Sequence, residues 1–235
     1  MAIPIAGHDV AADARSVFDC VRDGGVAIIH LDVAYAILGY TCESVQRIYG
    51  AKHRAYSKPT GILGNQQVHE EMHLLGALQR RMIRSITRDH DLPLAVIAPY
   101  RRDHPLLAAM DPFVFGNAVK GNTLNVLLNA GTLRNHIADL AVAEGLLFVG
   151  SSANTSLAGS RYRLEDIEAP VRAIADIEID YGTSHYANPH GLSSTMIDFS
   201  TYRVQRAGVC FEAIAAVMQD EFGVTLEAPA RGGAG

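Results

Sequence analysis

The sequence predicts an α/β protein with one domain. Short apolar or β-branched runs alternate with amphipathic helical segments from residue 9 to residue 222, and neither an internal repeat nor a long linker interrupts them. The chain has 235 residues, of which 49% are hydrophobic and 19% charged. This composition is ordinary for a globular protein and excludes a disordered chain, a collagen-like repeat and a coiled coil.

The elements follow from the spacing of apolar residues. Helical spacing predicts helices over 9–22, 41–50, 70–88, 133–144 and 209–222, with a further one over 163–175 that Pro170 interrupts. Apolar runs predict strands over 26–29, 94–98, 123–128, 146–149, 177–180, 195–199 and 203–205. The helix over 70–88 should bury Leu74, Leu75, Leu78, Met82 and Ile86. We expect the domain to cover 1–227 and the Gly/Ala-rich tail, 228–235, to be disordered.

Charge and cysteine content narrow the functional classes. The net charge of −5 argues against a general nucleic-acid coat, although it leaves room for a local basic patch. Three cysteines far apart are typical of buried thiols in a reducing compartment rather than of a disulfide scaffold. No secretory signal is recognisable, and the longest apolar run, 26–38, is too short to span a bilayer. These features predict a soluble cytoplasmic protein without a membrane partner.

The segment KHRAYSKP, residues 52–59, concentrates cations after a short helix. If the segment is extended, Lys52, Arg54 and Lys58 point the same way, because side chains alternate along an extended chain. Arginine then offers a planar fork and lysine a point charge for the oxygens of a polyphosphate. Taken alone, the same pattern also suits a solvated surface turn.

The segment GSSANTS, residues 150–156, follows the apolar strand 146–149. Hydroxyl and amide groups at the end of a buried strand lie where open α/β sheets bind ligands. They can bond a phosphate, a ribose or a base. A polar turn whose side chains cap the next segment needs the same residue types.

Together these segments resemble the YrdC-like family, which contains the threonylcarbamoyl-AMP synthases. The resemblance rests on GGVAIIHLDVAYAI, KHRAYSKP, SSAN, SSTMID and QRAG, which follow the family's motif order from Gly24 to Gly208. It implies a single YrdC-like domain, with a twisted, mixed, open sheet, flanking helices and a concave basic cleft. It also implies a nucleotidyltransferase that condenses ATP, bicarbonate and L-threonine into threonylcarbamoyladenylate with release of pyrophosphate, for tRNA modification.

The resemblance assigns roles to particular residues. Lys52 and Arg54 would be catalytic and, with Lys58, would hold the triphosphate. Ser152 and Asn154 would contact the adenylate, and Ser194 and Arg206 would close over the nucleotide. The full nucleotide set is Lys52, Arg54, Ser57, Lys58, Ser151, Ser152, Asn154, Ser194 and Arg206. Mg²⁺ would accompany ATP by bridging phosphate oxygens, and no metal site of the protein's own is expected.

The acceptor pocket departs from the family pattern. It would be formed by Leu31, Asp32, Val33, Tyr35 and Leu127. Leu31 and Val33 replace threonines, and the family's VRVP strand becomes VLLN at 126–129, without the arginine. Losing a charge-assisted bond of about 1.5–3 kcal/mol should weaken the binding of L-threonine. We therefore expect another amino acid or other small acceptor, with a more apolar group.

Two other readings remain open. A non-catalytic protein could use the same basic surface to bind nucleotides or double-stranded RNA. His69-Glu70-Glu71-Met72-His73 also matches H-E-x-x-H, the zinc metallopeptidase pattern, in which Glu70 would be the general base. The third histidine of the longer metzincin pattern is replaced by Gln79, so the metallopeptidase is the more remote of the two.

Overall fold

A mixed ten-stranded sheet forms the centre of the computed structural model, which describes residues 7–229. Its strands are β1 (Ala27–Ile29), β2 (Ala36–Gly39), β3 (Gly61–Leu63), β4 (Leu94–Pro99), β5 (Val119–Lys120), β6 (Thr123–Leu128), β7 (Phe148–Ser152), β8 (Ile177–Ile179), β9 (Thr195–Asp198) and β10 (Arg203–Arg206). The spatial order is β10-β9-β4-β6-β3-β7-β2-β1-β8, with β5 paired to β6. The sheet is open and mixed, as predicted: β4 runs antiparallel to β6 and parallel to β9.

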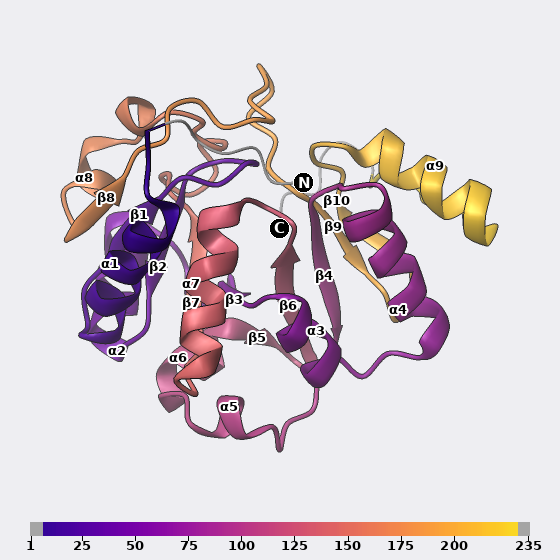
Figure 1. Ribbon diagram of the computed structural model, residues 1–235, viewed down its shortest axis with the longest axis horizontal. Helices are drawn as coiled ribbons and strands as arrows, with labels where there is room; N and C mark the ends of the chain where they lie inside the picture. The colour runs from indigo at the N-terminus through magenta and orange to yellow at the C-terminus, as the bar shows by residue number, and fades with distance from the viewer. Residues whose placement is uncertain (1–6, 230–235) are drawn as a thin grey trace.

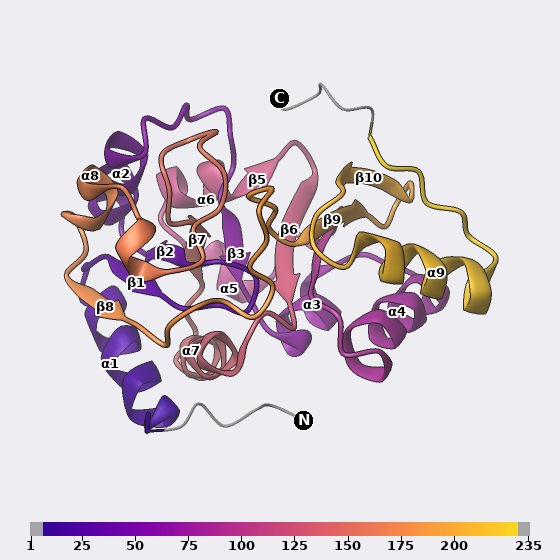
Figure 2. The same cartoon turned by 90° about the horizontal axis from the view of Figure 1, so that it is seen from above.

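Helices flank both faces of this sheet (Figures 1 and 2). They are α1 (Val10–Arg22), α2 (Cys42–Ala51), α3 (Gln66–Met72), α4 (Ala77–Arg84), α5 (Pro105–Ala108), α6 (Pro112–Ala118), α7 (Thr132–Ala143), α8 (Ala169–Arg172) and α9 (Phe211–Phe222). No helix within residues 7–229 is long and apolar enough to cross a membrane.

Strand β1 shows how the two faces are buried. Ala27 and Ile29 pack with α1 and α7 on one face, whereas Ile28 packs with Ile48 of α2 and Val171 of α8 on the other. Because successive side chains of a strand point to opposite faces, a strand covered on both sides is apolar throughout. The continuous run Val26-Ala27-Ile28-Ile29 therefore reflects burial on both faces of the sheet.

The helix predicted over 70–88 is wrong as a single element. It is divided into α3, α4 and a π-helical turn over Ser85–Asp89, and the chain between α3 and α4 is extended, with His73 bridged to Tyr100. Asn65 caps α3 by accepting a hydrogen bond from the Val68 amide (3.0 Å). Because of this break, residues before and after it do not lie on one continuous helical face. Leu74 and Leu78 are therefore 55% and 48% exposed rather than buried. Met82 and Ile86 are buried, as predicted.

Most other elements agree with the sequence, with three kinds of difference. The helix predicted over 163–175 is instead a 3-10 turn over Leu164–Asp166 and the short α8, at whose first turn Pro170 lies. The short elements β2, β3, β5, α5 and α6 were not predicted, because each has too few residues for a periodic pattern. Strand β7 continues to Ser152, beyond the predicted end at 149. Part of the tail predicted to be disordered, residues 230–235, lies outside the described residues.

Candidate functional site

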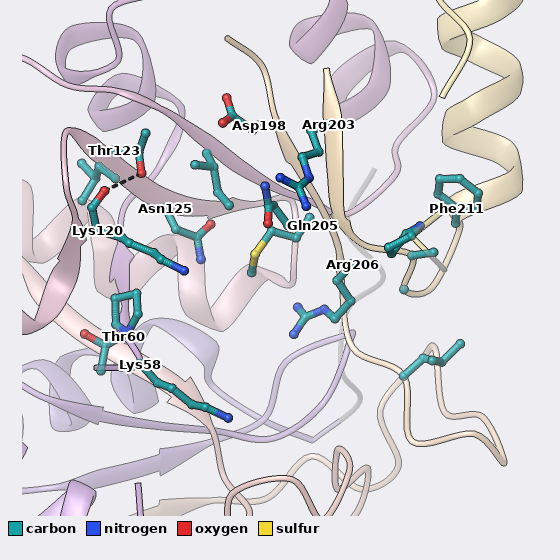
Figure 3. Close-up of a pocket in the computed structure, with 18 of the residues that line it drawn as sticks. Lys58, Thr60, Lys120, Thr123, Asn125, Asp198, Arg203, Gln205, Arg206 and Phe211 are labelled. Carbon is teal, nitrogen blue, oxygen red and sulfur yellow. Dashed lines mark hydrogen bonds between the residues drawn. The ribbon is translucent and has the colours of Figure 1, made fainter. Parts of the chain in front are cut away.

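Two adjoining cavities lie beside β3, β6, β9 and β10. The outer cleft, of about 1440 Å³, is lined by the segment 54–60, by the hairpin of β5 and β6, and by β9, β10 and the start of α9 (Figure 3). The inner cavity, of about 180 Å³, is lined by residues of β2, β3, β6 and β7 together with α7. Arg54, Pro59, Asn125, Met196 and Arg206 line both, so the two cavities meet at these side chains.

The outer cleft is basic. Its five cations are Arg54, Lys58, Lys120, Arg203 and Arg206, and within residues 7–229 none of them forms an ion pair. Lys58, Lys120 and Arg206 reach into the same open space from three separate segments (Figure 3). The lining also holds the carboxylates of Asp198 and Glu212, so cations outnumber carboxylates. Such an excess of cations in a concave surface attracts anions, because low-dielectric walls focus the field.

Local hydrogen bonds set the direction of Arg54. Its Nε donates to the Lys58 carbonyl (3.2 Å) and its Nη2 to the Pro59 carbonyl (2.7 Å), and its guanidinium lies over the ring of Tyr49. The Tyr49 hydroxyl donates to the same Lys58 carbonyl (2.8 Å). These contacts tie the turn 54–59 to α2 and hold Arg54 where both cavities meet.

Lys52 lies elsewhere. The segment 52–58 is a succession of turns rather than an extended chain, with His53 at φ 49°, so its cations do not point the same way. Lys52 is 1% exposed and lines neither cavity. Its Nζ donates to the carbonyls of Ser152 and Asn154 and to Asn154 Oδ1 (3.3 Å). Burial, reinforced by the Arg54 charge, lowers the pKa of Lys52 to about 7.

The predicted adenylate segment is part strand and part turn. Ser151 and Ser152 belong to β7, opposite Ile37 and Ala36 of β2, and both line the inner cavity. Asn154 lines neither cavity; its Oδ1 accepts from Ser152 Oγ and Lys52 Nζ, and its Nδ2 donates to the Thr155 carbonyl (2.7 Å). In this structure Lys52 and Asn154 therefore shape the loop after β7.

Ser194 and Arg206 form a pair at the boundary of the cavities. Arg206 Nε donates to the Ser194 carbonyl (2.9 Å) and Nη2 to Ser194 Oγ (3.1 Å). Burial lowers the pKa of Arg206. Ser57 lines the outer cleft, as Lys58 does.

The residues predicted for the acceptor pocket are largely brought together. Leu31, Val33, Tyr35 and Leu127 line the inner cavity. The Tyr35 hydroxyl has its partners outside this cavity. It donates to Asp180 Oδ1 (2.5 Å) and also lies 2.9 Å from the Gly182 carbonyl. Asp32 lines neither cavity, and burial raises its pKa.

An arginine that the sequence analysis missed lies at the inner cavity. Arg134 of α7 is 1% exposed. Its Nη1 is 3.5 Å from Asn135 Oδ1, and its Nη2 has no hydrogen-bond partner among residues 7–229. Burial alone lowers its pKa to about 9, which leaves the side chain charged at neutral pH. Arg134 shares the face of Ile137, Ala138 and Ala141, all buried. An arginine on an apolar helical face was the signal that could have found it.

The other missed residues lie in the outer cleft. Arg203 and Gln205 alternate with the buried Val204 along β10, and that alternation predicts one face open to a cleft. Lys120 belongs to the β5–β6 hairpin, and no sequence pattern connects that hairpin with the segment 54–60.

The two histidines of the H-E-x-x-H pattern bond each other. His73 Nε2 donates to the Leu124 carbonyl (3.2 Å), so Nδ1 of neutral His73 accepts from His69 Nδ1 at 2.8 Å. Both rings are buried, whereas Glu70 is bonded to Gln66 (3.0 Å) on the surface. Across residues 7–229 no group of three His, Cys, Asp or Glu side chains is placed to hold a metal ion. This geometry gives the zinc peptidase reading no support.

Comparisons with known proteins identify the fold. No family model and no curated protein matches the sequence. Among solved structures, a hypothetical protein of Streptococcus mutans UA159 has a TM-score of 0.75 at 19% identity, covering 91% of this chain and 93% of that one. P. abyssi Sua5 complexed with L-threonine has a TM-score of 0.69 at 17% identity, over 92% of this chain, which spans only 59% of the Sua5 chain.

A third structure, E. coli YciO, has a TM-score of 0.62 at 15% identity and covers 85% of this chain and 90% of its own. At these identities the likeness concerns the backbone and its topology rather than the chemistry of the site. The chain has the YrdC-like α/β fold.

Proposed function

We propose that the protein is a nucleotidyltransferase that forms a carbamoyl adenylate from ATP, bicarbonate and a small amino acid. The observation that carries this proposal is the outer cleft, where five cations that form no ion pair within residues 7–229 adjoin the small inner cavity. The cleft suits a triphosphate, and the inner cavity suits a compact acceptor next to its α-phosphate. The likeness to P. abyssi Sua5, whose structure holds L-threonine, supports an amino acid as the acceptor.

The reaction balances without a nucleophilic side chain. The amine of the acceptor adds to bicarbonate with loss of water to form a carbamate. A carbamate oxygen then attacks the α-phosphorus of ATP, the bond to the leaving pyrophosphate breaks, and carbamoyl-AMP and pyrophosphate result. Negative charge moves onto the pyrophosphate, so positioning and cationic stabilisation are what the protein must supply.

The residues divide between these tasks. Arg54, at the junction of the cavities, is proposed to bind the α- and β-phosphates, while Lys58, Lys120 and Arg203 bind the outer phosphates. Arg206 and Ser194 would close over the nucleotide, as the YrdC-like resemblance implies. Lys52 and Asn154 would act as positioning residues that hold the loop after β7 beside the inner cavity.

Mg²⁺ fits this cleft only as a companion of ATP. Asp198 and Glu212 are the acidic residues of the lining, and Asp198 Oδ1 already accepts from the Ser200 amide (2.9 Å) and hydroxyl (2.6 Å). Mg²⁺ commonly binds through one or two carboxylates plus substrate phosphates and waters. The ion would therefore neutralise phosphate oxygens, and Asp198 or Glu212 could supply a carboxylate to hold it.

The test is release of pyrophosphate from ATP in the presence of bicarbonate and a panel of amino acids. We expect release that needs bicarbonate and an amino acid together, and that is lost in Arg54→Ala. Arg163→Ala is the matched control, because Arg163 is exposed, pairs with Glu165 and lines neither cavity. No release with any acceptor, while ATP still binds, would contradict the enzyme and favour a nucleotide-binding protein. A titration with double-stranded RNA then tests the remaining alternative.

A further inference from the structure

The inner cavity holds a set of unpaired polar atoms. Arg134 Nη2, Ser151 Oγ and Asn125 Oδ1 are buried without a hydrogen-bond partner in the described part of the chain, and all three residues line this cavity. A buried polar atom without a partner costs free energy, so three around one space favour a polar ligand that supplies their partners. Two of them, the guanidinium and the hydroxyl, can donate to an anion.

The electrostatics of the cavity favour an anion. No aspartate or glutamate is among its lining residues within the described chain, and burial is the one cause that lowers the pKa of Arg134. Arg134 also lies in the first turn of α7, whose positive dipole end adds to its charge. A cation here has neither a counter-charge nor a favourable helix dipole, so it gains from a bound carboxylate more than an exposed arginine would.

Part of the cavity wall is apolar, and the cavity is small. Leu31, Val33, Leu63 and Ala95 are each at most 5% exposed and line the cavity together with Leu127. At about 180 Å³ the space is smaller than the roughly 300–1,000 Å³ typical of pockets for drug-sized ligands. These apolar residues offer no partner to a hydroxyl, whereas Ser152, Ser193 and Ser194 line other parts of the cavity. A ligand whose aliphatic side chain lies against the apolar part therefore loses less on entering than one with a polar side chain there.

We propose that Arg134 binds the carboxylate of an aliphatic amino acid such as L-valine. This amino acid would be the acceptor and would lie in the inner cavity. Arg134 would thus supply, from α7, the cation that the strand 126–129 lacks. Ser151 would donate the second hydrogen bond to the carboxylate. The identity of the acceptor rests on the proposed function, whereas binding of the amino acid to Arg134 can be measured without the reaction.

The experiment measures binding by calorimetry to the full chain, with and without a non-hydrolysable ATP analogue. The probes are L-valine, L-threonine, isobutylamine, which lacks the carboxylate, and bicarbonate alone. We expect L-valine to bind at least about tenfold more tightly than isobutylamine and more tightly than L-threonine, since charge-assisted bonds to the carboxylate are lost in the amine. Arg134→Met should abolish the advantage over isobutylamine.

The stability of the ligand-free variants gives a second readout. Because Arg134 is a buried charge that forms no ion pair within residues 7–229, Arg134→Met should raise the melting temperature of the ligand-free protein. Arg172→Met is the matched control: Arg172 pairs with Glu178 (2.7 Å), and its loss should not raise the melting temperature. A purely structural role for Arg134 predicts the opposite sign, a lower melting temperature.

Several results would overturn the proposal. These are equal affinities for L-valine and isobutylamine, no amino acid binding with or without the analogue, an unchanged L-valine affinity in Arg134→Met, or bicarbonate alone binding with the same dependence on Arg134. If Arg134→Met fails to fold, the wild-type comparison of L-valine with isobutylamine still decides, and Arg134→Lys tests the charge. Failure of the proposed function would give a different result from failure of this proposal. ATP would not bind or react, while L-valine would still bind through Arg134.

Discussion

Replacing Lys52 by methionine separates a role in shaping the site from direct contact with phosphate. The methionine keeps most of the aliphatic stem and removes the ammonium. Its three hydrogen bonds, to the carbonyls of Ser152 and Asn154 and to Asn154 Oδ1, are lost, and buried oxygens remain without that donor. Each unsatisfied buried acceptor costs about 1–3 kcal/mol, and removal of the desolvated charge offsets part of the sum.

We expect a net loss of about 3 kcal/mol in the free energy of unfolding. For a domain of this size, 1 kcal/mol corresponds to roughly 2–4 °C, so the melting temperature should fall by about 6–12 °C. Lys58→Met is the matched control, since Lys58 lines the outer cleft without an ion pair in residues 7–229. Its melting temperature should change by less than about 2 °C, within the usual range for surface substitutions, while its ATP affinity falls.

The pH dependence adds an independent check. Because the pKa of Lys52 is lowered to about 7, the unfolded chain binds more protons than the folded chain between about pH 7 and the ordinary lysine value of about 10.4. The Lys52 contribution to stability therefore rises with pH in this window, and the gap between wild type and Lys52→Met should widen from pH 7 to pH 9. Unchanged melting of Lys52→Met, or equal losses in both lysine variants, would refute the reasoning.

Three further predictions concern other parts of the site and the core. Arg54→Ala should weaken ATP binding by about 1.5–3 kcal/mol in calorimetry with a melting curve that remains cooperative, and unchanged affinity would remove Arg54 from the phosphate site. Tyr35→Phe removes the hydroxyl that helps to lower the pKa of Asp180. The Asp180 carboxylate stabilises the fold above its unfolded pKa, and this contribution is lost as the pH falls. The free energy of unfolding should therefore decrease less steeply with falling pH in Tyr35→Phe than in the wild type. Burial lowers the pKa of His69 and His73, so the unfolded chain takes up protons before the folded chain does. The free energy of unfolding should therefore fall as the pH drops below about 6.5. If the melting temperature of His69→Met fell with pH as steeply as that of the wild type, this reasoning would be contradicted.

Sequence reasoning worked best where many residues report the same pattern. Helices α1, α2 and α7 and strands β4 and β6 lie close to their predicted positions, because apolar residues repeat along each with one period. The region 70–88 failed for the same reason: Leu74 and Leu78 continue the helical spacing across a break. That break depends on the pairing of His73 with Tyr100, a contact between distant segments.

The sequence by itself determined the α/β class, the order of the main elements and the concentration of cations in 52–58. Only the tertiary structure decided which way those cations point: Arg54 lies at the junction of the cavities, whereas Lys52 is buried against the loop after β7. It also brought Arg134 from α7 to the cavity of Leu31 and Leu127. Local sequence patterns reflect the spacing of apolar residues and the propensity of each residue for helix or strand. The direction of a side chain and the meeting of separate segments arise instead from sheet register and packing, which involve residues far apart in the chain.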